Sequence, residues 1–159
     1  MTYYKGSNGG KIIYMDCYSG ISGDMFLGAL IDLGLKLEDL ERLLAGLPLS
    51  GYCLEASKIE HGGLSGTKLK VILEEKEEPA RHLPHILKII NDAQLPQAVK
   101  ENSGRVFRLL AEAEAKVHGT TIENVHFHEV GALDAIVDIV GTAAALHLLG
   151  VDQLHCSPL

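Results

Sequence analysis

Two histidines and three carboxylates lie close together in the last third of the chain, and their types suit the binding of a metal ion. His126 and His128 flank a phenylalanine, so in an extended strand both imidazoles share one face. The pattern that follows favours a helix, in which Asp134 and Asp138 also share one face. Imidazole and carboxylate groups are ligands of nickel, zinc and manganese. The spacing therefore predicts a divalent-metal site formed by His126, His128, Glu129, Asp134 and Asp138.

The position of Asp138 is the strongest part of this prediction. Its carboxylate interrupts the apolar run AIVDIVGTAAALHLL, where burial of a charge is costly unless a counter-charge or a metal ion accompanies it. A structural interpretation is also open. On that interpretation the histidines are surface residues of an edge strand, and Asp134 is a first-turn carboxylate that the helix dipole favours.

A second motif, CYSGISGD, is a glycine- and serine-rich turn between a predicted strand and a predicted helix. This geometry presents backbone N–H groups to an anion, and ligands gather at the carboxyl ends of strands in α/β sheets. We therefore predict that phosphate or substrate contacts are made by Asp16, Ser19, Gly20, Ser22, Gly23 and Asp24. The turn matches neither a Walker A loop nor G-x-G-x-x-G. The structural alternative is an ordinary N-cap at Ser22 or Asp24.

Apolar periodicity and the positions of glycine and proline predict the elements that hold these motifs. Strands are expected at residues 11–16, 52–60, 67–74, around the two histidines and at 153–156; helices are expected at 24–33, 37–44, 81–91, 98–118 and from 132 onward. The order β-α-α-β-β-α-α-β-α-β indicates an α/β or α+β fold, with a mixed sheet flanked by helices.

The predicted organisation is one compact domain over residues 11–159, preceded by a flexible leader over the polar, glycine-rich residues 1–10. If the first strand neighbours the histidine strand in the sheet, both motifs face one cleft. The final strand is followed by no predicted capping element, so we expect this domain to be the first part of a longer protein.

Composition excludes several classes of partner. The net charge is −7 and the pI is about 5.6, without a basic stripe, so nucleic acid is not expected as a partner. The longest apolar run is too short to span a bilayer and contains a carboxylate, and the polar start of the chain is not expected to be a signal peptide. Three widely separated cysteines argue for a reducing, cytoplasmic location. Two of them, Cys17 and Cys156, lie near the polar motifs, so a soft-metal role is open beside that of small buried hydrophobes.

The sequence resembles the amino-terminal part of the LarC family of nickel insertion proteins. The resemblance covers nearly all of the chain from Lys11 onward and lies in DCYSGISGDMFLGALIDLG, GGLSGTKLKV, AEAEAKVHG and VHFHEVGALDAIVDIVGTAAALHLLGVDQLHCSPL. It implies a nickel chelatase of the lyase class. Such an enzyme loads nickel into pyridinium-3,5-bisthiocarboxylic acid mononucleotide to make the nickel-pincer nucleotide cofactor of lactate racemase.

The resemblance further implies that CTP, with manganese or magnesium, is required by the full-length protein and is bound mainly by a separate carboxyl-terminal domain. This chain alone is then expected to be incomplete for turnover. The expected partners are the mononucleotide substrate, that carboxyl-terminal domain and further copies of the chain in a homo-oligomer. Relatives with a histidine-rich run differ from this chain, where EEKEEPARHL offers only His82, with His85 nearby.

The family does not assign the nickel ligands, so the ligand set above rests on ligand chemistry alone. Nickel insertion also needs a base for the proton of the ring carbon, and Glu129 or His128 is expected to provide it. Two rivals remain open. One is a metal-delivery module without chemistry of its own, and the other is a metal-dependent phosphohydrolase, since clustered Asp and His residues beside a glycine-rich turn also suit hydrolysis.

Overall fold

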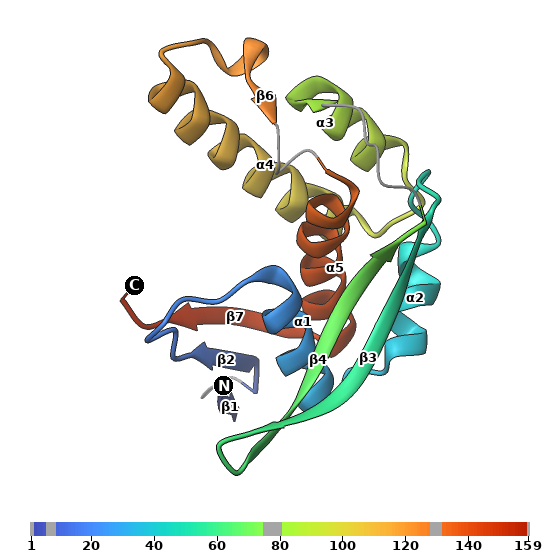
Figure 1. Cartoon of the computed structure of the whole chain (residues 1–159), viewed down its shortest axis with the longest axis vertical. Helices are drawn as coiled ribbons and strands as arrows, with labels where there is room; N and C mark the ends of the chain where they lie inside the picture. The colour runs from blue at the N-terminus through green and yellow to red at the C-terminus, as the bar shows by residue number, and fades with distance from the viewer. Residues whose placement is uncertain (1, 6–8, 75–80, 128–131, 159) are drawn as a thin grey trace.

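The computed structural model describes residues 2–5, 9–74, 81–127 and 132–158. Their strands are β1 (Thr2–Lys5), β2 (Lys11–Met15), β3 (Tyr52–His61), β4 (Leu64–Leu73), β5 (Arg81–His82), β6 (His126–Phe127) and β7 (Val151–Cys156). Their helices are α1 (Gly23–Asp32), α2 (Leu37–Leu44), α3 (Leu83–Asp92), α4 (Gln97–His118) and α5 (Leu133–Leu149), with a 3-10 turn η1 (Ile122–Asn124). The predicted α/β class is confirmed (Figure 1). No helix in this part of the chain is both long and apolar enough to cross a membrane.

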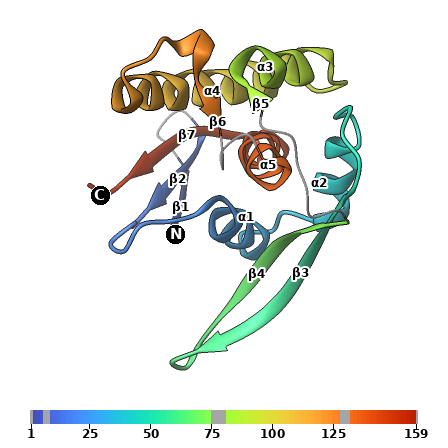
Figure 2. The same cartoon turned by 45° about the horizontal axis from the view of Figure 1, so that its top comes forward.

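Helix α5 is the centre of the fold, because apolar residues cover most of its circumference. It packs against α1, α2 and α4, and Figure 2 shows these helices around it, with α5 viewed nearly along its axis. Gly141 lies in this contact: a Cβ there would lie 3.4 Å from Leu27 of α1 and 3.6 Å from Leu44 of α2, which are ordinary contact distances. The buried apolar residues of α5 are Leu133, Ile136, Val137, Val140, Ala144 and Ala145.

Strand β2 is the middle of a three-stranded sheet in the order β1-β2-β7. It runs antiparallel to β1 and parallel to β7, with Met15 opposite Cys156. Residues 2–5, which lie within the expected leader, form β1. The physical reason is that β7 covers only one edge of β2, and threonine and tyrosine favour pairing along the other.

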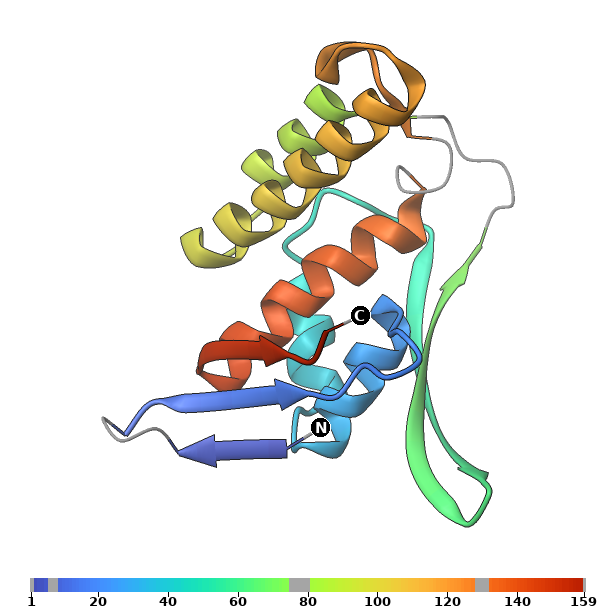
Figure 3. The same cartoon turned by 90° about the vertical axis from the view of Figure 1, so that its left-hand side faces the viewer.

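The strands expected at 52–60 and 67–74 are present as β3 and β4, which form a hairpin and pair antiparallel from Tyr52 opposite Leu73 to His61 opposite Leu64. Strand β4 lies against α1, and Figure 3 shows the hairpin as a long arm beside that helix. The contact is close at Gly28, where a Cβ would lie 2.2 Å from the carbonyl oxygen of Thr67. Only glycine therefore fits at this point of α1.

The histidine strand is present as the two residues of β6, and it pairs with β5. The helix expected over residues 81–91 begins at Leu83, because a proline in its first turn leaves the preceding residues extended. The strands therefore divide among three small sheets, and β2 and β6 are not neighbours in any of them. The cleft expected from their adjacency is not formed in that way.

Candidate metal and substrate site

The glycine-rich turn leads into α1 through Ser22, Gly23 and Asp24. Ser22 has the extended backbone of an N-cap residue, with φ −93° and ψ 166°. Its hydroxyl donates to Oδ1 of Asp24 instead of accepting a backbone N–H, and the same oxygen accepts the backbone N–H of Met25 at 2.7 Å. Ser22 is thus an N-cap by position, as the structural alternative holds, and it also orients the Asp24 carboxylate.

Asp138 of α5 packs directly on Gly23 of α1. A Cβ at Gly23 would lie 2.7 Å from both Cβ and Oδ2 of Asp138, so only glycine fits there. The Asp138 carboxylate accepts a hydrogen bond from the backbone N–H of Asp24. Its Oδ1 is buried and has no hydrogen-bond partner among the described residues. The contact between α1 and α5 therefore joins the two motifs that the sequence singles out.

The surroundings of Asp138 disfavour its negative charge. Burial, and after it the negative charges of Asp24 and Asp134, raise the pKa of Asp138 to about 6, although the hydrogen bond from Asp24 opposes the shift. A divalent cation among these carboxylates would stabilise their charged forms and displace the proton. The arrangement is therefore suited to bind a cation in exchange for a proton.

Asp134 occupies the first turn of α5 and is exposed. Its Oδ1 accepts the backbone N–H of Ala135 at 2.8 Å, as expected for a carboxylate at a helix N-terminus. Its charge nevertheless acts on Asp138. The structure thus brings Asp24, Asp134 and Asp138 within electrostatic reach of one another, although they come from two helices far apart in sequence.

This geometry bears on the predicted anion contacts. The first N–H groups of α1 already serve the carboxylates of Asp24 and Asp138, so a bare phosphate there would meet like charge. The rest of the turn is exposed at Asp16, Ser19 and Gly20. Gly20 has a φ of +80°, and its N–H donates to the Cys17 carbonyl at 2.9 Å. These exposed positions stay predicted substrate contacts, and a phosphate nearer the helix needs a cation between it and the carboxylates.

Two cavities flank the start of α1, and Ser22 lines both. One, of about 370 Å³, lies towards α4 and α5, and Asp138 is its acidic residue among mainly apolar walls that include Phe26, Val106 and Ile139. The other, of about 520 Å³, lies towards the hairpin, with Asp24, Asp32, Thr67 and Lys68 in its lining. The carboxylates therefore stand between two spaces that can accept a ligand.

Asp32 fixes the hairpin side of the second cavity. Its carboxylate accepts hydrogen bonds from Lys58 Nζ at 2.5 Å, from the Thr67 hydroxyl at 2.6 Å and from the Thr67 backbone N–H at 2.8 Å. The bonds from Lys58 and Thr67 hold the pKa of Asp32 below its usual value. Asp32 is therefore a positioning residue that ties β4 to the end of α1.

A pair of histidines lies at the β5–β6 ribbon. His82 Nδ1 donates to the carbonyl of Val125 at 3.1 Å, which puts the lone pair of the neutral ring on Nε2. The His85 ring stands edge-on to it, with centroids 5.9 Å apart, and the backbone of His126 is opposite His82. The predicted ligand set omits His82 and His85. The motif RHLPH could have indicated them in the sequence. Its proline favours a helix start, which places His82 at the N-cap and His85 in the first turn of α3.

His128 and Glu129, the predicted catalytic residues, lie outside the described residues, as does the side chain of His126. Among the side chains that are described, no group of three or more histidine, cysteine, aspartate and glutamate residues is arranged to hold a metal ion. The carboxylates of α1 and α5 and the histidines His82 and His85 are therefore two sets of candidate ligands on different elements. The full predicted ligand set stays a prediction.

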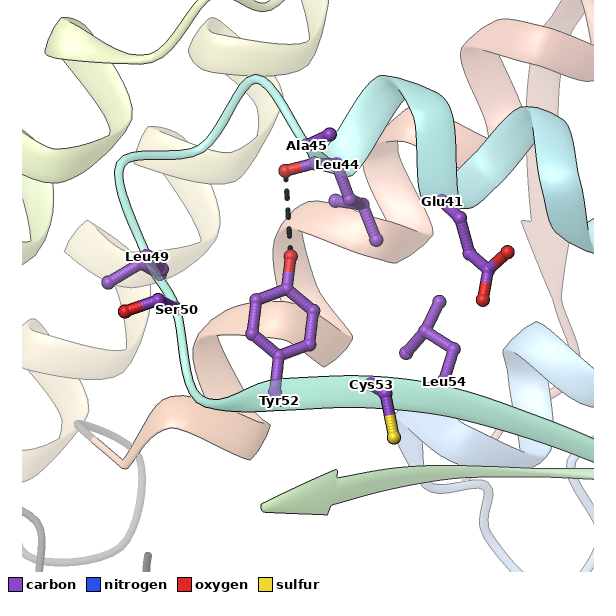
Figure 4. Close-up of a pocket in the computed structure, with 8 residues that line it drawn as sticks. All are labelled: Glu41, Leu44, Ala45, Leu49, Ser50, Tyr52, Cys53 and Leu54. Carbon is purple, nitrogen blue, oxygen red and sulfur yellow. Dashed lines mark hydrogen bonds between the residues drawn. The ribbon is translucent and has the colours of Figure 1, made fainter. Parts of the chain in front are cut away.

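A further cavity, of about 280 Å³, lies between α2 and β3 and contains none of the predicted site residues (Figure 4). The Tyr52 hydroxyl donates to the Leu44 carbonyl at 3.5 Å across it, and burial raises the pKa of Tyr52. Its polar side chains include Glu41 and Cys53, which the figure shows pointing in different directions. We therefore do not place the chemistry here.

Comparison with known proteins shows one consistent family. The family model described as nickel insertion protein matches residues 13–159. A relative from Geobacter sp. (strain M21), named "Putative nickel insertion protein", is 58% identical over 94% of this chain and 39% of its own length. A relative from Geobacillus kaustophilus (strain HTA426), named "Pyridinium-3,5-bisthiocarboxylic acid mononucleotide nickel insertion protein", is 47% identical over 94% of this chain and 38% of its own length. No solved structure matches the chain.

Proposed function

Because this chain belongs to the nickel insertion protein family, we propose that it binds nickel and holds the substrate for insertion of that metal into pyridinium-3,5-bisthiocarboxylic acid mononucleotide. The Geobacillus relative is named for this reaction. The observation that carries the proposal is the packing of Asp138 on Gly23, which keeps a buried, unpartnered carboxylate oxygen beside Asp24 and Asp134. Nickel is here the cargo of the reaction.

Insertion requires ligands that hold nickel and then release it to the substrate. Imidazole and carboxylate ligands exchange more readily than a closed thiolate cage. We assign the ligand role to His126, His128, Glu129, Asp134 and Asp138. The raised pKa of Asp138 favours release, because a proton replaces the departing nickel on that carboxylate near pH 6.

The substrate contributes a ring carbon that loses a proton when nickel bonds to it. Glu129 or His128 is the proposed acceptor of that proton. We propose that the turn residues Asp16, Ser19 and Gly20 contact the mononucleotide. Ser22, Gly23 and Asp24, where the turn enters α1, are proposed to contact it as well. The exposure of the first three supports this assignment, since a phosphate can reach them from solvent.

The chain spans about two fifths of the length of the relatives described above. For the whole protein we propose a CTP-dependent nickel chelatase of the lyase class, with manganese or magnesium, that acts in the cytoplasm and forms a homo-oligomer. Its product would be the nickel-pincer cofactor of lactate racemase. We place CTP binding mainly in the part of the relatives that this chain does not match, so this chain alone should lack turnover.

The proposal is tested by calorimetric titration of nickel into the chain. We compare the wild type with His126→Ala/His128→Ala and with Asp138→Asn. The double variant should lose measurable binding, and Asp138→Asn should bind roughly tenfold more weakly, because each change removes ligand atoms. Titration near pH 6 in two buffers of different ionisation enthalpy should show proton release in the wild type and less in Asp138→Asn.

The matched control is Asp92→Asn, which removes an exposed carboxylate on α3 that is paired with Lys88. Its nickel affinity should equal that of the wild type. Unchanged affinity in His126→Ala/His128→Ala would contradict the ligand assignment. Nickel binding without any change in proton release between wild type and Asp138→Asn would remove Asp138 from the site.

A delivery module is the second candidate function, because the carboxylates at the contact of α1 and α5 suit metal binding whether or not the chain holds the substrate. Such a module binds nickel and passes it to the rest of the protein without acting on the mononucleotide. Equilibrium binding of the metal-free mononucleotide separates the two. Binding that Ser19→Ala or Asp16→Asn weakens supports the substrate-holding proposal, whereas nickel binding without nucleotide binding supports delivery.

A further inference from the structure

Cys17 and Cys156 meet where the parallel strands β2 and β7 end, next to the proposed substrate turn, and the nickel proposal gives neither thiol a role. Met15 of β2 is opposite Cys156 of β7. The chain beyond the strands stays paired: the Ser157 N–H donates to the Met15 carbonyl at 2.9 Å, and the Cys17 N–H donates to Ser157 Oγ at 2.9 Å. Figure 3 shows both strands running in the same direction to this point.

The hydrogen bonds of Ser157 to Met15 and Cys17 place Cys156 beside Cys17, and the interaction between their thiols is the main cause that raises the pKa of Cys17. Both cysteines are free thiols in this structure. Their environments differ: Cys17 is buried, with 3% of its surface exposed, whereas Cys156 is exposed. The pair therefore combines a thiol that solvent reagents can reach with a sheltered one beside it.

We propose that Cys17 and Cys156 form a thiol–disulfide exchange site that reacts with small disulfides, of the class of oxidised glutathione, and closes into an intramolecular disulfide. The exposed thiol of Cys156 is the group that meets the reagent, and the buried thiol of Cys17 is the resolving group. The third cysteine, Cys53, is exposed on β3 and belongs to a different sheet, so it serves as an internal comparison.

The exchange takes place in two steps. The thiolate of Cys156 attacks one sulfur of the reagent disulfide, which forms a mixed disulfide and releases one reagent thiolate. Cys17 then loses its proton to solvent, and its thiolate attacks the Cys156 sulfur and expels the second reagent thiolate. Two protein thiols are oxidised by two electrons in total, the reagent disulfide is reduced, and the two protons end on the two released thiols.

The contact with Cys156, followed by burial and by the negative charges of Cys156 and Asp16, raises the pKa of Cys17. Cys17 therefore rests as a neutral thiol and does not react first. Once Cys156 carries the reagent, Cys17 reacts with the mixed disulfide on Cys156 and with no further molecule of reagent. The product would tie the segment that carries Asp16, Ser19 and Gly20 to the end of β7.

The test uses the whole chain with Cys53→Ser and the aromatic disulfide dithionitrobenzoate. Trypsin places Cys17 in residues 12–36 and Cys156 in residues 117–159, since no Lys or Arg interrupts either stretch. We expect release of two thionitrobenzoate ions per chain, and a linkage of those two peptides that has lost two hydrogens and retains no reagent. Adding Cys17→Ser should stop the reaction at one ion, with the reagent retained on 117–159.

A reagent adduct that persists on Cys156 in the chain with both thiols would overturn the proposal. So would a linkage that forms only when urea has unfolded the chain. Neither outcome depends on the folding of the Cys17→Ser variant, because both are read from the chain that retains the pair. In a series of reduced-to-oxidised glutathione ratios, the linked fraction should rise and fall reversibly, and retained glutathione on 117–159 instead of the link would also contradict the proposal.

Discussion

At the scale of single residues, the contact between Gly23 and Asp138 joins the glycine-rich turn to the central helix. The space at Gly23 is filled by a carboxylate, with Cβ and Oδ2 of Asp138 both 2.7 Å from where a side chain would begin. We expect Gly23→Ala to lower the free energy of unfolding by about 1–3 kcal/mol, because α1 and α5 must separate to admit the methyl group. Urea unfolding followed by circular dichroism measures this change.

The matched control is Gly66→Ala in β4. A Cβ there meets its nearest neighbouring atom, Oδ2 of Asp32, only at 3.8 Å, which is an ordinary contact distance. Its unfolding free energy should therefore stay within about 0.5 kcal/mol of the wild type. Equal losses for Gly23→Ala and Gly66→Ala would contradict a specific effect of the Asp138 contact, because backbone entropy alone makes a Gly→Ala change stabilising.

The titration of Asp138 gives a second prediction at this scale. An aspartate with a pKa of 3.8 in the unfolded chain and about 6 in the folded one binds its proton more tightly when folded. Unfolding therefore releases a proton between these values, and stability falls as pH rises through that window. Below this window the folded chain does not bear the cost of ionising Asp138, and above the window it bears the full cost.

We expect the wild type to lose about 1–2 kcal/mol of stability across this window, a figure reduced for the partial exposure of Asp138. Asp138→Asn should show no such loss, because its amide does not ionise. Urea unfolding at pH values on both sides of the window measures the difference between the two proteins. A constant difference would contradict the assigned pKa, and added nickel should restore the stability of the wild type above pH 6 if the cation binds there.

At the scale of elements, the hairpin β3–β4 depends on Asp32 for its attachment to α1. We expect Asp32→Ala to cost about 1–3 kcal/mol, because the backbone N–H and hydroxyl of Thr67 both lose their acceptor. Lys58→Met should cost less than about 1 kcal/mol, because the Lys58 side chain is 70% exposed and its ion pair is solvent-screened.

Amide hydrogen exchange at Thr67 distinguishes the two changes, since only Asp32→Ala removes the partner of that N–H. Asp39→Ala, which breaks an exposed ion pair with Arg42 on α2, is the control and should leave exchange at Thr67 unchanged. Equally fast exchange in Lys58→Met and Asp32→Ala would show that the ion pair, and not the backbone bond, holds the hairpin.

The helices could be predicted from sequence because their apolar spacing and their ends are local signals. Residues 37–44 form α2 as expected, and α1 and α4 begin within one residue of expectation. Strand β5 carries no such signal, since its two residues, Arg81 and His82, are polar and directly precede the helix pattern of α3. Its pairing with β6 is a tertiary contact, so neither the ribbon nor the position of His82 beside Val125 follows from local pattern.

The candidate site divides in the same way. The costly position of Asp138 in an apolar helix is visible in the sequence, and the structure places that carboxylate beside Asp24 and Asp134. What the sequence could not show is how they meet, because the route runs through the packing of α5 on α1 and not through neighbouring strands. The roles predicted for His126, His128 and Glu129 stay predictions.

At the scale of the whole molecule, the parallel pair of β2 and β7 joins segments from opposite ends of the sequence. A ribosome makes β2 early and β7 only after nearly all of the chain described here. Strand β2 therefore cannot pair with β7 until that part of the chain has been made. Pairing across so long a loop is slow, because chain entropy must be lost before any contact forms. Helix α5, which covers the apolar faces of α1 and α2, directly precedes β7 and is therefore also made late. Until α5 is made, those faces lack this cover. The same long-range closure that brings Cys17 to Cys156 thus leaves apolar surface of the nascent chain uncovered while it grows, and such surface favours aggregation.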